Sequence, residues 1–386
     1  MKDYIILYRI IKLKMLLLNL LRRIIMKYVP YLYSLDGELS ALKNQSFSSN
    51  IVPLINIVKD KKLKNSTKSI LDELENSINS KTSNTFFVNI PMNLELTKKS
   101  LKKPISRFFK EITLNPLYYI NTLKKFDKLS NVIPVIDVAI SNYTNGDLKK
   151  IRSQLNSQNI AYSFDAKKSN VIIPELSNLI IENDILIYNL HTYGFYQKSI
   201  RDEIKQINKL KNINKFKTLV VKQIYTDFTF FKMPNDKITP SDSGYDCIDL
   251  DFFDDFSTFE FDYFGDYAGI RNTPIYSGGL SYPSFIALNI NDFSHFGFKG
   301  IPKDPNSYSS TLLPNILKST YWNKILTQVH KKPSYGCSQI NYFNTLHVPA
   351  GKSNPINSPS TWKTLTISHY ISMMDYKLKN CLINTH

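Results

Sequence analysis

The sequence predicts a (β/α)8 barrel of the TIM-barrel type, an α/β fold, on three observations. From Lys27 onward, eight apolar segments of strand length follow one another. Seven helix-like or linking stretches separate them, as expected for strands that all run in parallel. The apolar segments are continuous runs, which is typical of parallel strands buried on both faces. A doubly wound open sheet is the alternative, but it normally has a glycine-rich phosphate turn after its first strand, and this chain has none.

A repeated phrase marks three of these strands: YVPYLYS at 28–34, IVPLINIV at 51–58 and VIPVIDVA at 132–139. In each, a β-branched residue precedes a proline. Proline has no N–H for a sheet ladder and is best tolerated at the first residue of a strand, so the phrase predicts strand openings. A polar or amphipathic residue stands three places after each proline: Tyr33, Asn56 and Asp137.

The elements follow in order along the chain. Helix 35–44 is predicted by acidic residues at its start and a lysine near its end, and helix 68–80 by apolar residues at helical spacing. The expected strands are 28–34, 52–58, 85–90, 132–139, 160–166, 184–191, 218–225 and 259–269. The other expected helices are one beginning near Pro116, then 147–157, 175–182 and 197–210.

Three regions are expected: an N-terminal extension at 1–26, the barrel at 27–271, and a C-terminal region at 272–386. The last is rich in Pro, Gly and Ser, with helices predicted at 314–326 and 360–380. Many barrels elaborate the loops after their late strands, so this loop-rich region is either such an elaboration or a small subdomain packed on the barrel.

The first 25 residues carry six basic residues and one acidic residue among Ile, Leu and Tyr. Charges interrupt every apolar run, so no stretch of about 18 apolar residues is available to span a membrane. A signal peptide is not indicated either. The alternatives are an interfacial amphipathic helix, a helix packed on the core, or a gene model extended upstream of a natural start at Met26.

Composition indicates a cytoplasmic protein. The three cysteines, Cys247, Cys337 and Cys381, are widely separated, which predicts neither a zinc cage nor a disulfide framework. The net charge of +17 suggests a nucleic-acid partner. However, only 7 of the 49 basic residues are arginine, the residue favoured for phosphate and base contacts. A solvated lysine-rich exterior is the simpler interpretation of this basic protein, and nucleic acid is a weakly supported partner.

The candidate catalytic residues follow the expected strands, because barrel enzymes build their sites at the carboxyl ends of the strands. Asp137, Asp165 and His191 end three successive strands, and Asp262 and Asp266 belong to the eighth. Two carboxylates and an imidazole can serve as general acid and base or bind a divalent cation. The alternative is structural: the carboxylates accept hydrogen bonds from loop N–H groups and shape the rim.

Candidate ligand-binding residues lie at the same ends of the strands. Asn56, Asn89 and Lys222 end the second, third and seventh strands. In the segment FGDYAGIR at 264–271, Gly265 allows close backbone approach, Tyr267 follows, and Arg271 can neutralise a phosphate, as loops after late strands often do. A tight turn is the alternative reason for the glycines.

Two further features are interpreted conservatively. The acidic stretch at 246–262 lacks the spacing of an EF-hand and is expected to be a solvated loop or to dock on the lysine-rich surface of the protein itself. His347 and His369 lie far along the chain from the strand ends, and a buried, hydrogen-bonded His369 is expected.

Four segments carry a family resemblance: KYVPYLYSLDGELSALKN at 27–44, IVPLINIVKD at 51–60, FGDYAGI at 264–270 and WKTLTISHYI at 362–371. Together they resemble the beta protein family of T-even bacteriophages and its bacterial relatives. The resemblance implies a phage or phage-defence setting without specifying a reaction. It also implies that a set of residues belongs to the family pattern: Pro30, Glu38, Pro53, Gly265, Asp266, Tyr267 and His369. Asn56 and Tyr370 depart from that pattern.

Two functional hypotheses follow. The first is an enzyme acting on a small phosphorylated or nucleotide-like ligand at the barrel mouth. The second is a non-catalytic interaction protein that uses the barrel as a scaffold to bind a protein or nucleic-acid partner. No cofactor is specified, although the carboxylates make a divalent cation one of the open alternatives.

Overall fold

A computed structural model describes most of the chain. The described residues are 27–61, 68–92, 101–142, 148–222, 244–245, 256, 258–270, 283–291, 295–301, 303–346 and 354–380. The N-terminal extension, the acidic residues from 246 to 255, Gln223, Arg271, His347, Cys247 and Cys381 lie outside them.

Eight parallel strands close into a barrel, which confirms the predicted (β/α)8 fold. Each strand pairs with the next along the chain, and the last pairs with the first. The strands are β1 (Lys27–Tyr33), β2 (Leu54–Asn56), β3 (Phe86–Asn89), β4 (Val132–Asp137), β5 (Ala161–Asp165), β6 (Ile185–His191), β7 (Lys217–Lys222) and β9 (Tyr263–Asp266).

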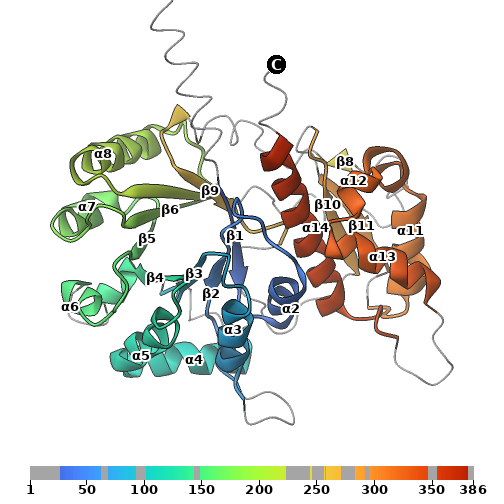
Figure 1. Ribbon diagram of the computed structural model, residues 1–386, viewed down its shortest axis with the longest axis horizontal. Coiled ribbons are helices and arrows are strands. Elements are labelled where there is room, and N and C mark those ends of the chain that lie inside the picture. The colour runs from blue at the N-terminus through green and yellow to red at the C-terminus, as the bar shows by residue number, and fades with distance from the viewer. Residues whose placement is uncertain are drawn as a thin grey trace, which may run out of the picture.

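Helices cover the outside of the barrel, and Figure 1 shows them as an arc around the strands. They are α2 (Asp36–Asn44), α3 (Ile70–Asn79), α4 (Lys103–Leu114), α5 (Pro116–Asp127), α6 (Leu148–Arg152), α7 (Ser169–Ser177) and α8 (Lys198–Asn214). Sequence reasoning missed α4, although its buried Ile105, Phe108, Phe109 and Ile112 have helical spacing. It also placed the helix after β5 too late, because Pro174 lies inside α7 rather than before it.

The prolines are only partly strand openings. Pro53 directly precedes β2, as predicted, but Pro30 and Pro134 lie inside β1 and β4. The sheet tolerates these two prolines because the hydrogen-bond ladder to one neighbouring strand has not yet begun at their positions. The β1–β2 ladder begins at Tyr31, one residue after Pro30, and the β4–β5 ladder begins at Val135, one residue after Pro134.

A second lobe is built mainly from the chain after β9, with one short strand from before it. Its antiparallel sheet consists of β8 (Gly244–Tyr245), β10 (Ser284–Leu288) and β11 (His295–Lys299). Its helices are α11 (Leu313–Lys318), α12 (Gln328–Lys331), α13 (Tyr335–Thr345) and α14 (Pro359–Asn380), and π-helical turns span Tyr308–Leu312 and Tyr321–Ile325. The prediction of the last helix is confirmed. Strands β10 and β11 were not expected, because the sequence of this region is rich in turn-forming residues.

Helix α14 joins the two parts. It packs on α2 and β1 of the barrel and on β10 and α13 of the lobe, so it lies between them in Figure 1. In the barrel it covers the β1–β9 side, where the eighth helix of a (β/α)8 fold belongs.

Buried polar contacts fix this junction. Asp266 of β9 accepts hydrogen bonds from the hydroxyls of Tyr28 in β1 and Tyr370 in α14. The carboxylate of Glu38 in α2, 1% exposed, forms an ion pair with Lys363 of α14. One continuous apolar core runs through barrel and lobe, so the C-terminal region is packed into the same body as the barrel.

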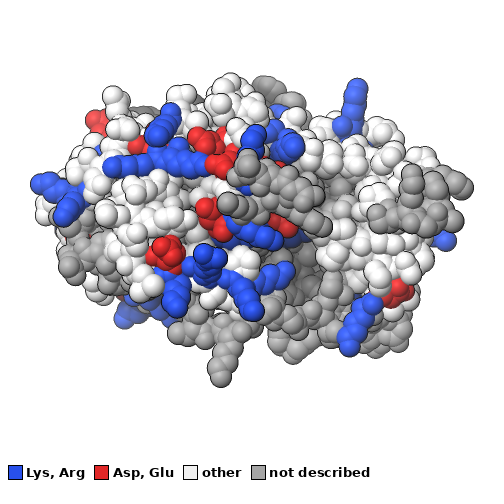
Figure 2. Space-filling view, turned by 90° about the horizontal axis from the view of Figure 1, so that it is seen from below, with Lys and Arg blue, Asp and Glu red and all other residues white. Residues whose placement is uncertain are grey.

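The two parts differ in surface character. Residues 272–386 contain ten lysines and three aspartates but no arginine or glutamate. In the view of Figure 2, side chains of both charges gather over the barrel side, and the lobe side is largely uncharged. None of the helices in the described part of the chain has the length and apolarity needed to cross a membrane.

Candidate active site

A polar cluster fills the carboxyl end of the barrel. Alternate residues of a strand share a face, and Tyr31, Asn89, Asp137 and Asp165 all face inward at this end. The rings of Tyr31 in β1 and Tyr267, just after β9, have centroids 4.9 Å apart. Burial, and then the neighbouring Tyr267, Asp137 and Asp165, raise the pKa of Tyr31 well above its usual range. Strands distant in sequence thus bring two carboxyl groups and two phenols together.

Asp137 is a buried acid of this cluster with a strongly raised pKa. Its side chain is 4% exposed, and its two oxygens accept hydrogen bonds from the backbone N–H groups of Met92 (2.9 Å) and Ala139 (3.0 Å). Burial raises its pKa to about 7 against the opposing effect of these donors, and the charge of Asp165 adds to the increase. Asp137 is therefore poised to give or take a proton near neutrality.

Asp165 and His191 form a carboxylate–imidazole pair beside it. His191 Nε2 lies 2.8 Å from Asp165 Oδ1, and the His191 side chain is one-third exposed. His191 has a φ of 51°, a left-handed conformation that costs a non-glycine residue energy. It occurs where the β6–β7 register shifts. The irregularity sets the direction of the imidazole at the end of β6.

The predicted asparagines connect the strands beneath the cluster. The register places Tyr33, Asn56 and Asn89 side by side on β1, β2 and β3. Asn89 Nδ2 donates to Asn56 Oδ1 (2.8 Å), and Asn56 Nδ2 donates to the carbonyl oxygen of Leu32 (3.2 Å). Asn56 is fully buried, and its contacts link neighbouring strands. Asn89 also contacts the Tyr31 hydroxyl.

Lysines surround the rim. Lys222, at the end of β7, is 3% exposed, and its ammonium lies 5.9 Å from the centroid of the Phe195 ring. Lys168 Nζ lies 3.7 Å from Asp165, and Lys167 lies over the Tyr193 ring at 4.0 Å. Sequence reasoning found Lys222 but missed Lys167, Lys168 and Tyr31. Period-two alternation back from Tyr33 could have indicated Tyr31.

Three other predicted residues lie apart from this cluster. Asp262 precedes β9 rather than ending it, so it lies at the amino end of the barrel, where it bonds Thr218 and Lys211. Asp266 faces outward to Tyr370, as described above. A Cβ atom on Gly265 would lie 2.4 Å from the carbonyl oxygen of Val29, so tight β1–β9 packing already requires glycine there. Arg271 is outside the described residues.

The described residues include no group of three or more His, Cys, Asp or Glu side chains placed to hold a metal ion. Asp137 and Asp165 influence one another electrostatically at the mouth, and His191 contacts Asp165.

The lobe contains a second cluster of titratable groups, around the predicted core residue His369. Its Nε2 lies 2.7 Å from the Tyr321 hydroxyl and its Nδ1 lies 3.4 Å from Cys337 Sγ. Burial lowers the pKa of His369 to about 3 and raises that of Cys337 to about 11. Both side chains are fully buried. A neutral, enclosed thiol is a poor nucleophile, so this cluster is structural.

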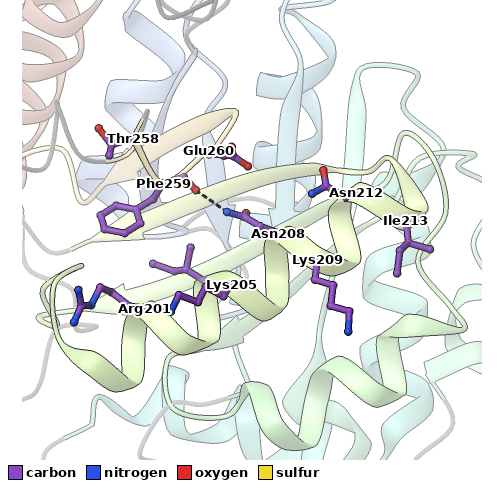
Figure 3. A pocket seen from close by; sticks show the side chains of 10 residues that line it. Arg201, Lys205, Asn208, Lys209, Asn212, Ile213, Thr258, Phe259 and Glu260 are labelled. Carbon is purple, nitrogen blue, oxygen red and sulfur yellow. Dashed lines mark hydrogen bonds between the residues drawn. The ribbon is translucent and has the colours of Figure 1, made fainter. Parts of the chain in front are cut away.

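A surface groove of about 720 Å³ lies on the outside of the barrel between α8 and residues 258–260. Figure 3 shows Asn208 of α8 reaching up to the carbonyl oxygen of Phe259, a 3.2 Å hydrogen bond, with Arg201 and Lys205 further along the helix. None of the mouth residues lines it. The groove is thus a separate surface feature.

A comparison with protein families identifies this chain's family. The family model described as Beta protein matches residues 28–285, which include the strand β8, the first two residues of β10 and all of the barrel except Lys27. Neither a curated protein nor a solved structure matches the chain.

Proposed function

The chain belongs to the Beta protein family, and we propose that it is an enzyme that acts by acid–base catalysis on a small phosphorylated ligand at the barrel mouth. The observation that carries the proposal is Asp137, a buried acid with a pKa raised to about 7. Strongly shifted groups in a cleft are frequent in active sites.

The roles follow from the contacts. Asp137, half protonated near pH 7, exchanges a proton with the ligand. His191 is the second proton carrier, because the Asp165 carboxylate at its Nε2 orients the ring. Tyr31 and Tyr267 remain protonated, since burial raises the pKa of each, and their hydroxyls can donate to a ligand oxygen.

A negatively charged ligand fits the rim. Lys222 and the pair Lys167 and Lys168 supply positive charge at the ends of β7 and β5. Phosphate groups are a common partner of loops at this end of (β/α)8 barrels. The phage or phage-defence setting is part of the proposal and is supported by family membership alone.

Asp137→Asn tests the proposal, because it removes the titrating proton and preserves side-chain shape. The protein is incubated with a pool of nucleotides and other phosphorylated metabolites, and consumption is followed by mass spectrometry. We expect turnover to fall by about 10²- to 10⁴-fold, the usual contribution of a general acid or base. The wild-type rate should change near pH 7, and the variant should lose that change.

Asp262→Asn is the matched control. It alters an aspartate of the same barrel at the opposite end, where Asp262 bonds Lys211 and Thr218. Full activity in a folded Asp137→Asn variant, or equal losses in both variants, would contradict the proposed role.

The interaction-protein alternative is favoured by the α8 groove. Its lining combines the exposed cations Arg201, Lys205 and Lys209 with Phe259, a pattern suited to an acidic protein partner. Replacing Lys205 and Lys209 by glutamate should abolish function in a phage-restriction or toxicity assay if this surface is the functional one. The mouth variants would then leave function intact.

A further inference from the structure

The barrel has a second opening, at the amino ends of its strands and opposite the mouth. A hollow of about 180 Å³ lies there, and every barrel strand or the residues just before it contribute to its wall. The lining residues are Lys27, Val52, Thr85, Phe87, Ile133, Asn159, Asn183, Ile185, Lys217 and Tyr263.

Strand periodicity explains why these side chains meet. Lys27 lies four residues before Tyr31 on β1, so both face the barrel interior, one at each end. Lys217 lies two residues before Leu219 on β7. Tyr263 of β9 pairs with Lys27 on one side and with Leu219 on the other. Two lysines thus flank one strand at the base of the barrel interior.

The two ammonium groups influence one another. Burial lowers the pKa of Lys27, and the positive charge of Lys217 lowers it further. None of the described residues that line the hollow carries a carboxylate. Like charges brought together in a partly desolvated space cost free energy that a bound anion would relieve.

The two acidic residues that precede β6 and β9 form ion pairs on the outside of the barrel. Asp184, which precedes β6, is fully buried and bonds Arg152 at 2.6 Å. Asp262, which precedes β9, bonds Lys211 at 2.7 Å. Both belong to the outward-facing set of their strands, opposite in parity to Ile185 and Tyr263. Outside the barrel base these acids are paired with cations, whereas the charged residues among the described lining of the hollow are both lysines.

Neutral donors complete the wall. The side chains of Thr85, Asn159 and Asn183 make no hydrogen bond to other groups in the described part of the chain, so their donors are available to a ligand. Asn183 has a φ of 72°, which asparagine tolerates better than most residues and which fixes the turn into β6.

We propose that the amino-terminal opening of the barrel binds a small doubly charged oxyanion, phosphate or sulfate, between Lys27 and Lys217. The hollow has room for a free oxyanion, because its volume is several times the roughly 30 Å³ that one water molecule occupies. This site is independent of the proton-transfer groups at the mouth, and it would stabilise the folded protein by closing the base of the barrel with a counter-charge.

The test measures thermal unfolding and calorimetric binding of the whole chain with inorganic phosphate or sulfate, each against sodium chloride at the same ionic strength. A ligand that binds only the folded state raises Tm. At tenfold excess over Kd we expect a rise of roughly 2 °C in the wild type. We expect at least a tenfold weaker Kd in Lys27→Met and in Lys217→Gln.

Lys217 is exposed at the strand end, so Lys217→Gln is expected to fold and carries the test if Lys27→Met does not. Lys205→Met, an exposed lysine of the α8 groove, is the matched control and should bind like the wild type. The proposal is overturned if chloride gives the same rise in Tm, if Lys217→Gln keeps wild-type affinity, or if Lys205→Met loses as much affinity as Lys217→Gln.

Discussion

The barrel mouth and the C-terminal lobe both bury titratable side chains, but with opposite consequences. At the mouth, Asp137 has a pKa raised to about 7, so it is close to ionisation at neutral pH. In the lobe, burial lowers the pKa values of His295 and His369 to about 3, so both are neutral there. The mouth holds a group near its titration point, and the lobe holds groups far from theirs.

The difference follows from the contacts that each set of groups makes. His369 bridges Tyr321 and Cys337 with both ring nitrogens, and the His295 ring stacks on Tyr370 with centroids 5.7 Å apart. These contacts use the neutral imidazole. Asp137, in contrast, is held by two backbone donors that favour the charged form in a site that disfavours it. These opposed effects leave the pKa of Asp137 at about 7, and a group with a pKa near the ambient pH exchanges its proton readily.

The largest expected effect is acid destabilisation through the lobe. A histidine whose folded pKa is lowered binds its proton more readily when unfolded, so its stabilising effect is lost as pH falls from about 6.5 toward 3. The loss for each of His295 and His369 is on the order of 4 kcal/mol. Urea unfolding at a series of pH values measures it. His369→Gln should be less stable at pH 7 but should decline less steeply in acid, and parallel curves would argue against buried neutral histidine.

A somewhat smaller effect of opposite sign is expected at the mouth. The folded pKa of Asp137 is raised, so stability is lost as pH rises from about 4 to 7 and then stays level. Across that interval the free energy of unfolding of the wild type should fall, relative to that of Asp137→Asn, by at most on the order of 4 kcal/mol. The difference between the two unfolding curves isolates this group from the histidines. A difference that does not change with pH would show that Asp137 titrates normally.

The smallest effect concerns the junction between the two regions. Tyr370→Phe removes one of the hydroxyls that donate to Asp266 and leaves a buried carboxylate oxygen without that partner. The expected loss is about 1–3 kcal/mol in the free energy of unfolding. Chemical denaturation should still give one transition, because the apolar core is continuous. Tyr342→Phe, an exposed tyrosine of the lobe, is the control and should be neutral.

The barrel was predictable because each strand carries its own signal. Continuous apolar runs mark buried parallel strands whatever their neighbours, and the positions of Asp137, Asp165 and His191 at the carboxyl ends of their strands follow from the same runs. The prediction for Asp262 depended on a strand boundary. The strand was expected to begin at Phe259 but begins at Tyr263, which moves that aspartate to the opposite end of the barrel.

Contacts between distant segments could not be predicted. The hydroxyls of Tyr28 and Tyr370 donate to the carboxylate of Asp266 from 238 and 104 residues away in sequence. Nothing in the sequence around Asp266 indicates these partners. The raised pKa of Asp137 likewise depends on the burial that the whole barrel provides. The strands β10 and β11 are short and flanked by proline and glycine, so their pairing appears only when the lobe is assembled.

The position of α14 has a consequence for how the protein is made. Strand β1 leaves the ribosome before the other described elements, and the helix that covers it, α14, is the last of them. During synthesis the β1–β9 side of the barrel therefore stays uncovered until almost every other element exists. Nascent chains with exposed apolar strands aggregate readily. Stalled translation before residue 359 should thus yield chaperone-bound species rather than a free barrel.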